Sequence, residues 1–157
     1  HLHHVAGKVV AMTEFQEFGK AYALDTVANA QAFGAAMAAE GFEVSAESRG
    51  YTASHQILTC HGEPDSGAGT RAAQQLEDAG IITNMNMLPG DTKAMTPSGL
   101  RLGVQELTRH GMGTGEMEEV ARLFARVLIA DEDPASVKPD VNSMRADFQE
   151  VSYCFSE

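Results

Sequence analysis

The long helical pattern at the start of the chain constrains the fold most. Apolar or small residues recur there every three or four positions, at Ala23, Val27, Ala30, Gly34 and Met37. This spacing places them along one side of an α-helix, and that side must pack against other elements. Gly41 stands where a helix C-terminus favours glycine. The sequence therefore predicts helices over residues 3–18 and 20–40, which are nearly continuous.

Short stretches after this helix have the character of β-strands. Alternating apolar and polar residues predict a half-buried strand at Phe42–Glu47. Further strands are expected at His55–Cys60, Ile81–Asn84 and Leu100–Val104. Residues 85–98 are rich in turn-forming Pro, Gly, Asp and Ser, and we expect a long irregular loop. Loops of this length in compact domains are usually functional or mobile.

Three more helices are predicted. One runs from about Thr70 to Ala79 and ends at Gly80, and a clearly amphipathic one covers Glu116–Ile129. A last helix is expected to begin near Pro139, since proline suits the first helical position. Its inward residues are Val141, Met144, Phe148 and Val151. The prediction is an α+β fold, a two-layer α/β sandwich in which helices cover a small mixed or antiparallel sheet of about three or four strands.

Composition and charge limit the class of protein. With 157 residues, 43% of them apolar and 21% charged, the chain has the size and balance of one globular domain. The net charge of −11 argues against a nucleic-acid partner, because phosphate binding needs a basic surface. No apolar run reaches the roughly 20 residues of a membrane span. No segment reads as a signal peptide, so we expect a cytoplasmic protein without a membrane partner.

Arg101 is the strongest candidate for binding a ligand. It lies within Ser98–Gly103, in a predicted strand that follows a glycine-containing loop, and no acidic residue stands close to it in sequence. Such a guanidinium can bind a carboxylate through two parallel hydrogen bonds. The flanking glycines would let a ligand approach the backbone closely. The alternative is an arginine that caps the sheet edge or pairs with one of the chain's 22 acidic residues.

Metal-binding patterns are weak in this sequence. His1, His3 and His4 would bind copper or nickel if His1 carried a free terminal amine, and otherwise they begin a helix or belong to a longer protein. Cys60 and Cys154 are too few for a disulfide framework, and neither has a partner at zinc-ligand spacing. We therefore expect no metal site of ordinary protein ligands.

Two further pairs of polar residues invite a functional interpretation. Ser54 and His55 are adjacent, but neighbours on a strand point to opposite faces, so a positioned or buried histidine is favoured over a nucleophile with its base. Asn84 and Asn86 would hydrogen-bond a flat heterocycle, or they favour a turn for local reasons. The glycines of Gly62–Gly69 lack the spacing of a phosphate-binding loop and predict a connection.

Several segments resemble, in the same order, one known family, the serine hydroxymethyltransferases. His3–Ala11 is similar to the helix that joins the family's two domains, and Val27–Phe33 with Gly41–Val44 is similar to the long helix and first strand of its small domain. Ala79–Asn86 with Pro89–Asp91 is similar to the family's segment of two asparagines before Pro-x-Asp. Ser98–Gly103 with Leu107–Met112 is similar to the family's signature near the end of the sequence. The ordered set covers nearly the whole chain and is more specific than any one segment.

The resemblance implies both a fold and an activity. Residues 1–40 would be a long inter-domain helical segment and residues 41–157 the C-terminal small domain of a type I pyridoxal-phosphate enzyme, whose cofactor-binding large domain is absent from this chain. Such enzymes make or break the Cα–Cβ bond of β-hydroxy amino acids such as serine, and breaking this bond in serine yields glycine. By this resemblance Arg101 holds the substrate carboxylate, His55 binds substrate, and Asn86 contacts the pterin of tetrahydrofolate.

The resemblance also says what this chain lacks. Its lysines are Lys8, Lys20, Lys93 and Lys138, and none stands in the Thr-His-Lys context where the family attaches its cofactor. We therefore expect no catalytic residue in this chain and no turnover by the chain alone. The full-length enzyme would be a homodimer or larger.

Departures from the common pattern leave the substrate open. The loop between Asp91 and Ser98 is shorter than usual, Thr52–Gln56 replaces the usual Asp-Asn-His, and Val104–Glu106 replaces Thr-Pro-Ala. Such variants resemble archaeal-type hydroxymethyltransferases, enzymes acting on α-methylserine, and threonine transaldolases, which need no folate. The alternative from another functional class is a non-catalytic stand-alone domain that binds or assembles with a partner.

Overall fold

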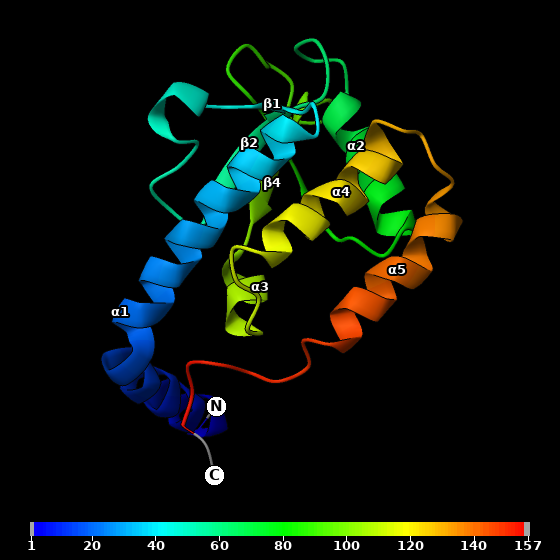
Figure 1. Cartoon of the computed structure of the whole chain (residues 1–157). Helices are drawn as coiled ribbons and strands as arrows, with labels where there is room; N and C mark the ends of the chain where they lie inside the picture. The colour runs from blue at the N-terminus through cyan, green and yellow to red at the C-terminus, as the bar shows by residue number, and fades with distance from the viewer. Residues whose placement is uncertain (1, 156–157) are drawn as a thin grey trace.

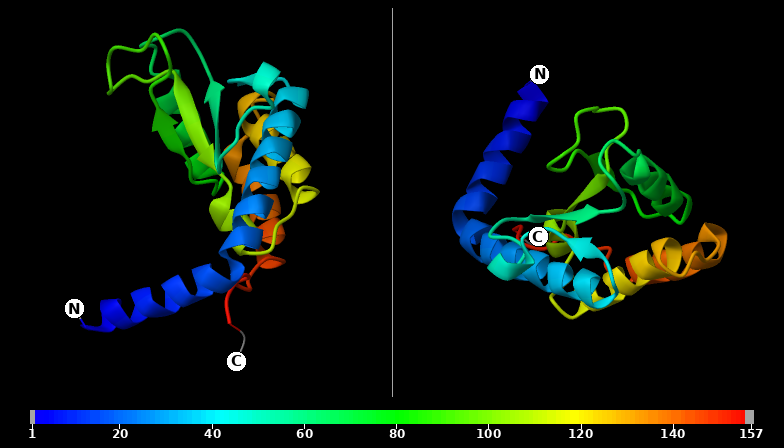
Figure 2. Two further views of the ribbon diagram at one scale, coloured as in Figure 1. Left: turned by 90° about the vertical axis from the view of Figure 1, so that its left-hand side faces the viewer. Right: turned by 90° about the horizontal axis from the view of Figure 1, so that it is seen from above.

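A single helix, α1 (Leu2–Ala39), begins the computed structural model, which describes residues 2–155. The two helices expected from the sequence are thus one, and it bends in its first half (Figure 2). Its buried residues are Gly19, Thr26, Asn29, Ala30, Phe33, Gly34 and Met37. Ala23, expected on the buried stripe, is exposed. Residues 2–13 of α1 project away from the other elements, and the apolar Leu2, Val9 and Met12 among them are exposed. Glu14 contacts α3 through a salt bridge with Arg109 at 3.1 Å.

Four short strands form one antiparallel sheet. They are β1 (Glu43–Val44), β2 (Gln56–Cys60), β3 (Asn84–Asn86) and β4 (Gly99–Gly103), in the order β1-β2-β4-β3. In the centre of the sheet Leu58 pairs with Arg101, and on the other side of β4 Asn84 pairs with the same Arg101. The predicted α+β fold is therefore confirmed. Of the mixed or antiparallel sheet of about three or four strands that was expected, the structure has an antiparallel sheet of four strands.

The helices gather on one face of this sheet. Besides α1 they are α2 (Ala68–Asp78), α3 (Gln105–Arg109), α4 (Glu116–Leu128) and α5 (Pro134–Ala146), with a 3-10 turn at Glu47–Arg49. α1 contacts β1 and β2, α2 contacts β3 and β4, and α4 packs against both helices, with α5 beyond it (Figure 1). No helix covers the opposite face of the sheet in the views of residues 2–155 (Figure 2).

The strand expected at Ile81–Asn84 was wrong. α2 ends in a Schellman motif, in which Gly80 has a φ of 85° and the Ile81 amide donates to the carbonyl of Leu76 at 2.8 Å. Ile82 is 87% exposed, so this apolar pair is not a buried strand. Pairing with β4 begins only at Asn84, the last residue of the expected strand, and it places residues 85 and 86 in a strand instead of the expected loop.

The expected start of the last helix was also wrong. α5 begins at Pro134, because the carboxylate of Asp133 accepts a hydrogen bond from the amide of Ala135 at 3.0 Å and caps the helix. Pro139 therefore lies inside α5. The helix ends at Ala146, so Val151 lies beyond it and is 51% exposed, instead of facing inward as expected.

Glycine allows α2 to approach β4 closely. A Cβ atom at Gly69 would collide with the carbonyl oxygen and other backbone atoms of Gly99. Backbone cannot yield as a flexible side chain can, so this helix–strand distance requires glycine. The same approach lets Leu76 and Leu100 reach complete burial in the core.

We expect Gly69→Ala to lower the free energy of unfolding by about 1–3 kcal/mol, through steric overlap with β4. Gly7→Ala is the matched control, because a Cβ at Gly7 meets nothing within 4 Å. That change removes a helical glycine without a clash and should raise stability by at most about 1 kcal/mol. Urea unfolding of both variants measures the difference, and equal effects would refute the close-approach argument.

Candidate functional site

The open face of the sheet carries the main polar candidates. In β4 Leu100 and Leu102 are buried toward the helices, so Arg101 between them points to the open face and is exposed. Asn84 lies directly opposite Arg101 in the antiparallel register, and residues paired this way share a face. Asn86, two residues further along β3, points to the same side. Arg101, Asn84 and Asn86 thus lie on one surface.

Asn84 and Arg101 are in direct contact. With the carboxamide oriented so that both of its ends meet complementary groups, Asn84 accepts a hydrogen bond from Arg101 Nη2 at 2.7 Å. The other end of the amide donates to the carbonyl of Met85 at 3.2 Å. No carboxylate of residues 2–155 forms a salt bridge with Arg101. The guanidinium therefore keeps its full charge and most of its donors.

The two glycines beside Arg101 differ in their surroundings. Gly99 is buried, and a Cβ there would lie 2.5 Å from Leu88 Cγ and 2.7 Å from the carbonyl oxygen of Thr59, so this glycine serves internal packing instead of ligand approach. Gly103 is exposed and lines the cleft described below, and a Cβ there would meet the flexible side chain of Gln105 at 2.5 Å. The expectation of a backbone open to a ligand was therefore wrong for Gly99.

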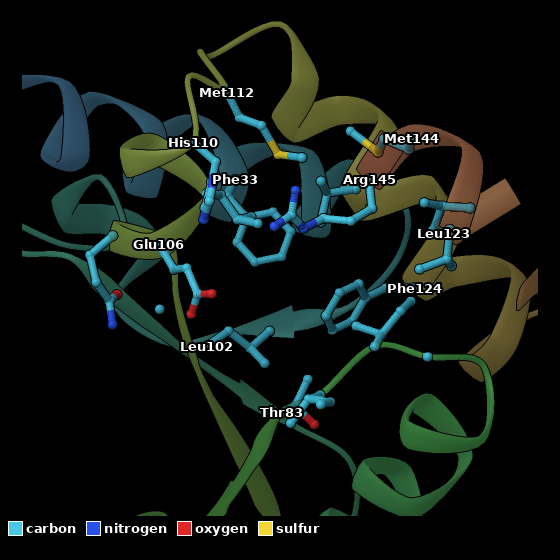
Figure 3. A pocket seen from close by; sticks show the side chains of 18 of the residues that line it. Phe33, Thr83, Leu102, Glu106, His110, Met112, Leu123, Phe124, Met144 and Arg145 are labelled. Atoms are coloured by element: carbon cyan, nitrogen blue, oxygen red, sulfur yellow. The ribbon is translucent and has the colours of Figure 1, made fainter. Parts of the chain in front are cut away.

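Arg101 and His55 line one cleft of about 960 Å³ at an end of the sheet. Gln56 and Asn84 lie beside them, and the side chains of Phe33, Leu102 and Phe124 contribute apolar walls. Figure 3 shows Glu106 of α3 and Arg145 of α5 directed toward the cleft from different sides. The cleft thus combines two guanidinium groups, a carboxylate and apolar surface, which suits a small charged organic ligand.

His55 enters the cleft from just before β2. Its backbone carbonyl accepts a hydrogen bond from the amide of Val104 at 3.0 Å, which extends the β2–β4 pairing by one step, and its side chain is exposed. The preceding Ser54 makes its hydroxyl contact with Thr52 at 3.2 Å. Among the described residues no hydrogen bond joins the Ser54 hydroxyl to the His55 ring.

Asn86 lies outside the residues that line the cleft. Its side-chain nitrogen donates to the carbonyl of Met87 at 2.6 Å, and the residue is half-buried at the end of β3. The sheet brings Asn86 to the same face as Arg101 but toward the other end of β4, where it pairs with Gly99. A ligand contacting both residues would have to extend along the strands.

Two aspartates that we did not identify as site residues hold the loops beside Asn86. The Asp91 carboxylate accepts hydrogen bonds from the amides of Asp65 at 2.6 Å, Leu88 at 2.8 Å and Ser98 at 2.9 Å, and from the Ser98 hydroxyl at 2.8 Å. These bonds, the Ser98 amide first, hold the pKa of Asp91 well below its usual range. Asp91 thereby ties the turn after β3 to the residue before β4.

Asp65 forms the other half of this connection. Its carboxylate accepts hydrogen bonds from the hydroxyl of Thr92 at 2.6 Å and from the amides of Thr92 and Lys93, each at 2.8 Å. The Thr92 hydroxyl is the main cause of a lowered pKa at Asp65. The Pro-x-Asp segment pointed to Asp91, but spacing along the chain carries no sign of Asp65 as its neighbour.

A half-buried imidazole, that of His61, lies just after β2. His61 Nε2 lies 2.9 Å from the hydroxyl of the fully buried Thr59, and its ring makes an edge contact with Phe42. Desolvation by burial lowers the pKa of His61 to about 4. The imidazole is therefore neutral at pH 7 in the folded chain.

This burial makes stability depend on pH. The unfolded chain takes up a proton at His61 near pH 6.5 and the folded chain only near pH 4, so stability falls as the pH drops between these values. We expect a loss of about 2–3 kcal/mol in the free energy of unfolding from pH 7.5 to 4.5. His61→Gln should remove most of this loss in urea unfolding at each pH, and parallel profiles for the two proteins would contradict it.

The remaining sequence candidates lie apart from the cleft. His1 is outside the described residues, while His3 and His4 stand next to each other on α1 with ring centroids 4.2 Å apart. Within residues 2–155 no group of three or more His, Cys, Asp or Glu side chains is arranged to hold a metal ion. Cys60 and Cys154 are half-buried free thiols. The same residues include no helix with the length and apolar character needed to cross a bilayer.

Fold and site together define an α+β domain with a helix-covered sheet face and an open face that carries a candidate anion-binding arginine. Residues 1–124 match the family model described as serine hydroxymethyltransferase. The chain is 52% identical over 157 residues to the serine hydroxymethyltransferase of Thermococcus kodakarensis, and 50% identical to that of Methanopyrus kandleri. This chain belongs to the serine hydroxymethyltransferase family.

Each of these two relatives is matched over 99% of this chain and 36% of its own length. The chain therefore spans about a third of the curated relatives that it matches. Among solved structures, the L-threonine transaldolase from Pseudomonas fluorescens superposes with a TM-score of 0.83 at 30% sequence identity. That match covers 93% of this chain and 33% of the transaldolase, so the similarity again concerns about a third of a longer protein.

Proposed function

We propose that this chain is the C-terminal small domain of a pyridoxal-phosphate-dependent serine hydroxymethyltransferase. The enzyme would make and break the Cα–Cβ bond between serine and glycine, and would be a cytoplasmic homodimer or larger assembly. Residues 1–40 would form the inter-domain helix and residues 41–157 the small domain. The observation that carries the proposal is Arg101, an exposed guanidinium without a carboxylate partner among the described residues, on a sheet face without a covering helix.

In this proposal Arg101 binds the α-carboxylate of the amino acid. A planar guanidinium can form two parallel hydrogen bonds to a carboxylate, which sets both the position and the orientation of the substrate. His55 lies on the same cleft and would contact the substrate beside it. Asn86 would meet the pterin of tetrahydrofolate further along the open face.

The chain's own residues do not suit it to hold the cofactor alone. Its four lysines are exposed, and none lines the cleft. When bound, pyridoxal phosphate supplies an electron sink for the bond-breaking step. We expect the large domain to bind it, and the small domain to contribute Arg101 and His55 to the same site. The chain by itself should therefore show no turnover.

Arg101→Ala in the full-length enzyme tests the proposal. Loss of a bidentate charged contact should lower kcat/KM for serine by about 30-fold or more, equivalent to about 2–5 kcal/mol of transition-state binding. Arg122→Ala is the matched control, because Arg122 is an exposed residue of α4 that pairs with Glu119 away from the cleft. Steady-state kinetics with serine as the varied substrate gives the answer, and wild-type values for Arg101→Ala would overturn the assignment.

A threonine transaldolase is the second candidate, favoured by the structural similarity to the Pseudomonas fluorescens enzyme. The higher identity to serine hydroxymethyltransferases supports the first proposal, with α-methylserine as a further substrate to test. We expect glycine formation from serine to require tetrahydrofolate in the full-length enzyme. Turnover of threonine with an aldehyde acceptor and no folate would favour the transaldolase instead.

A further inference from the structure

Arg101 has a neutral partner, although the chain has 22 acidic and 11 basic residues. Arg109, Arg122 and Arg126 form salt bridges with carboxylates at 2.5–3.1 Å, whereas Arg71 and Arg145 donate to backbone carbonyls. Arg101 instead meets the amide oxygen of Asn84, at 2.7 Å. An amide orients a guanidinium by a hydrogen bond but leaves its positive charge uncompensated.

Backbone pairing keeps Asn84 in place. Asn84 and Arg101 are directly opposed in the β3–β4 ladder, where opposed Cβ atoms lie within about 5.5 Å. The amide is held at its other end by the carbonyl of Met85 at 3.2 Å. Asn84, whose amide is held at both ends, limits the rotamers that the long side chain of Arg101 can adopt. Without this contact, Arg101 would lose the corresponding conformational entropy when a ligand binds.

We propose that Asn84 is a positioning residue for substrate binding: it holds the guanidinium of Arg101 in the orientation that receives the amino-acid carboxylate, without neutralising it. The inference rests on the proposed role of Arg101. It names a determinant of affinity for the carboxylate and explains why an amide is suited to this position. An aspartate there would form an ion pair with Arg101 and compete with the substrate.

Two variants of the full-length enzyme separate orientation from charge. In Asn84→Ala the guanidinium loses its anchor, and we expect KM for serine to rise by about 5- to 50-fold with kcat nearly unchanged. In Asn84→Asp the shape is kept but the charge of Arg101 is compensated, and KM should rise further than in Asn84→Ala. A purely structural role for Asn84 would predict the opposite order, because aspartate preserves the shape and the hydrogen bond to Arg101.

Gln74→Glu is the matched control, since it makes the same amide-to-acid change on an exposed residue of α2. It should leave KM and kcat at wild-type values, and a raised KM there would overturn the proposal as an effect of overall charge. An unchanged KM in Asn84→Ala, or a smaller KM effect in Asn84→Asp than in Asn84→Ala, would also overturn it. Arg101→Ala, measured in parallel with the Asn84 variants, shows whether such a result contradicts only the proposed role of Asn84 or also the proposed role of Arg101.

Discussion

Burial of one face of the sheet under α1 and α2 is the constraint on which the site depends. Leu100 and Leu102 are drawn into the core, and alternation along β4 then forces Arg101 to the opposite face. A slip of one residue in the β2–β4 pairing would bury the guanidinium and expose both leucines. The hydrophobic core therefore determines the direction of Arg101.

The open face carries a guanidinium and amide groups on an acidic protein. Arg101 and Asn84 are in contact on it, at 2.7 Å. The carboxylates of Asp65 and Asp91 accept hydrogen bonds from loop amides and hydroxyls, and they connect the loop after β2 to the loop between β3 and β4. In our proposal the open face would meet the domain that carries the cofactor.

The elements that the sequence predicted well are those with their signal contained in one segment. α4 matches the predicted helix to within one residue at its end, and β2 lies within the expected strand His55–Cys60. β3 begins three residues later than expected because pairing with β4 decided its position against the apolar character of Ile81 and Ile82. α5 was misplaced because a local capping bond at Asp133 outweighed the preference of Pro139 for a first turn. Arg101 and Asn84 were both candidates in the sequence, but nothing there indicated that they are partners.

The fold class and the family could be predicted from the sequence, because periodicity and ordered motifs are properties of the chain. The sequence also named Arg101 as the candidate for binding a ligand, but the groups that meet Arg101 became known only from the packed structure. Asn84 reaches it through the register of two strands, and Leu88 and the carbonyl of Thr59 fill the space beside Gly99. Contacts between distant segments depend on how helices and strands pack, and that packing is a cooperative outcome of the whole core.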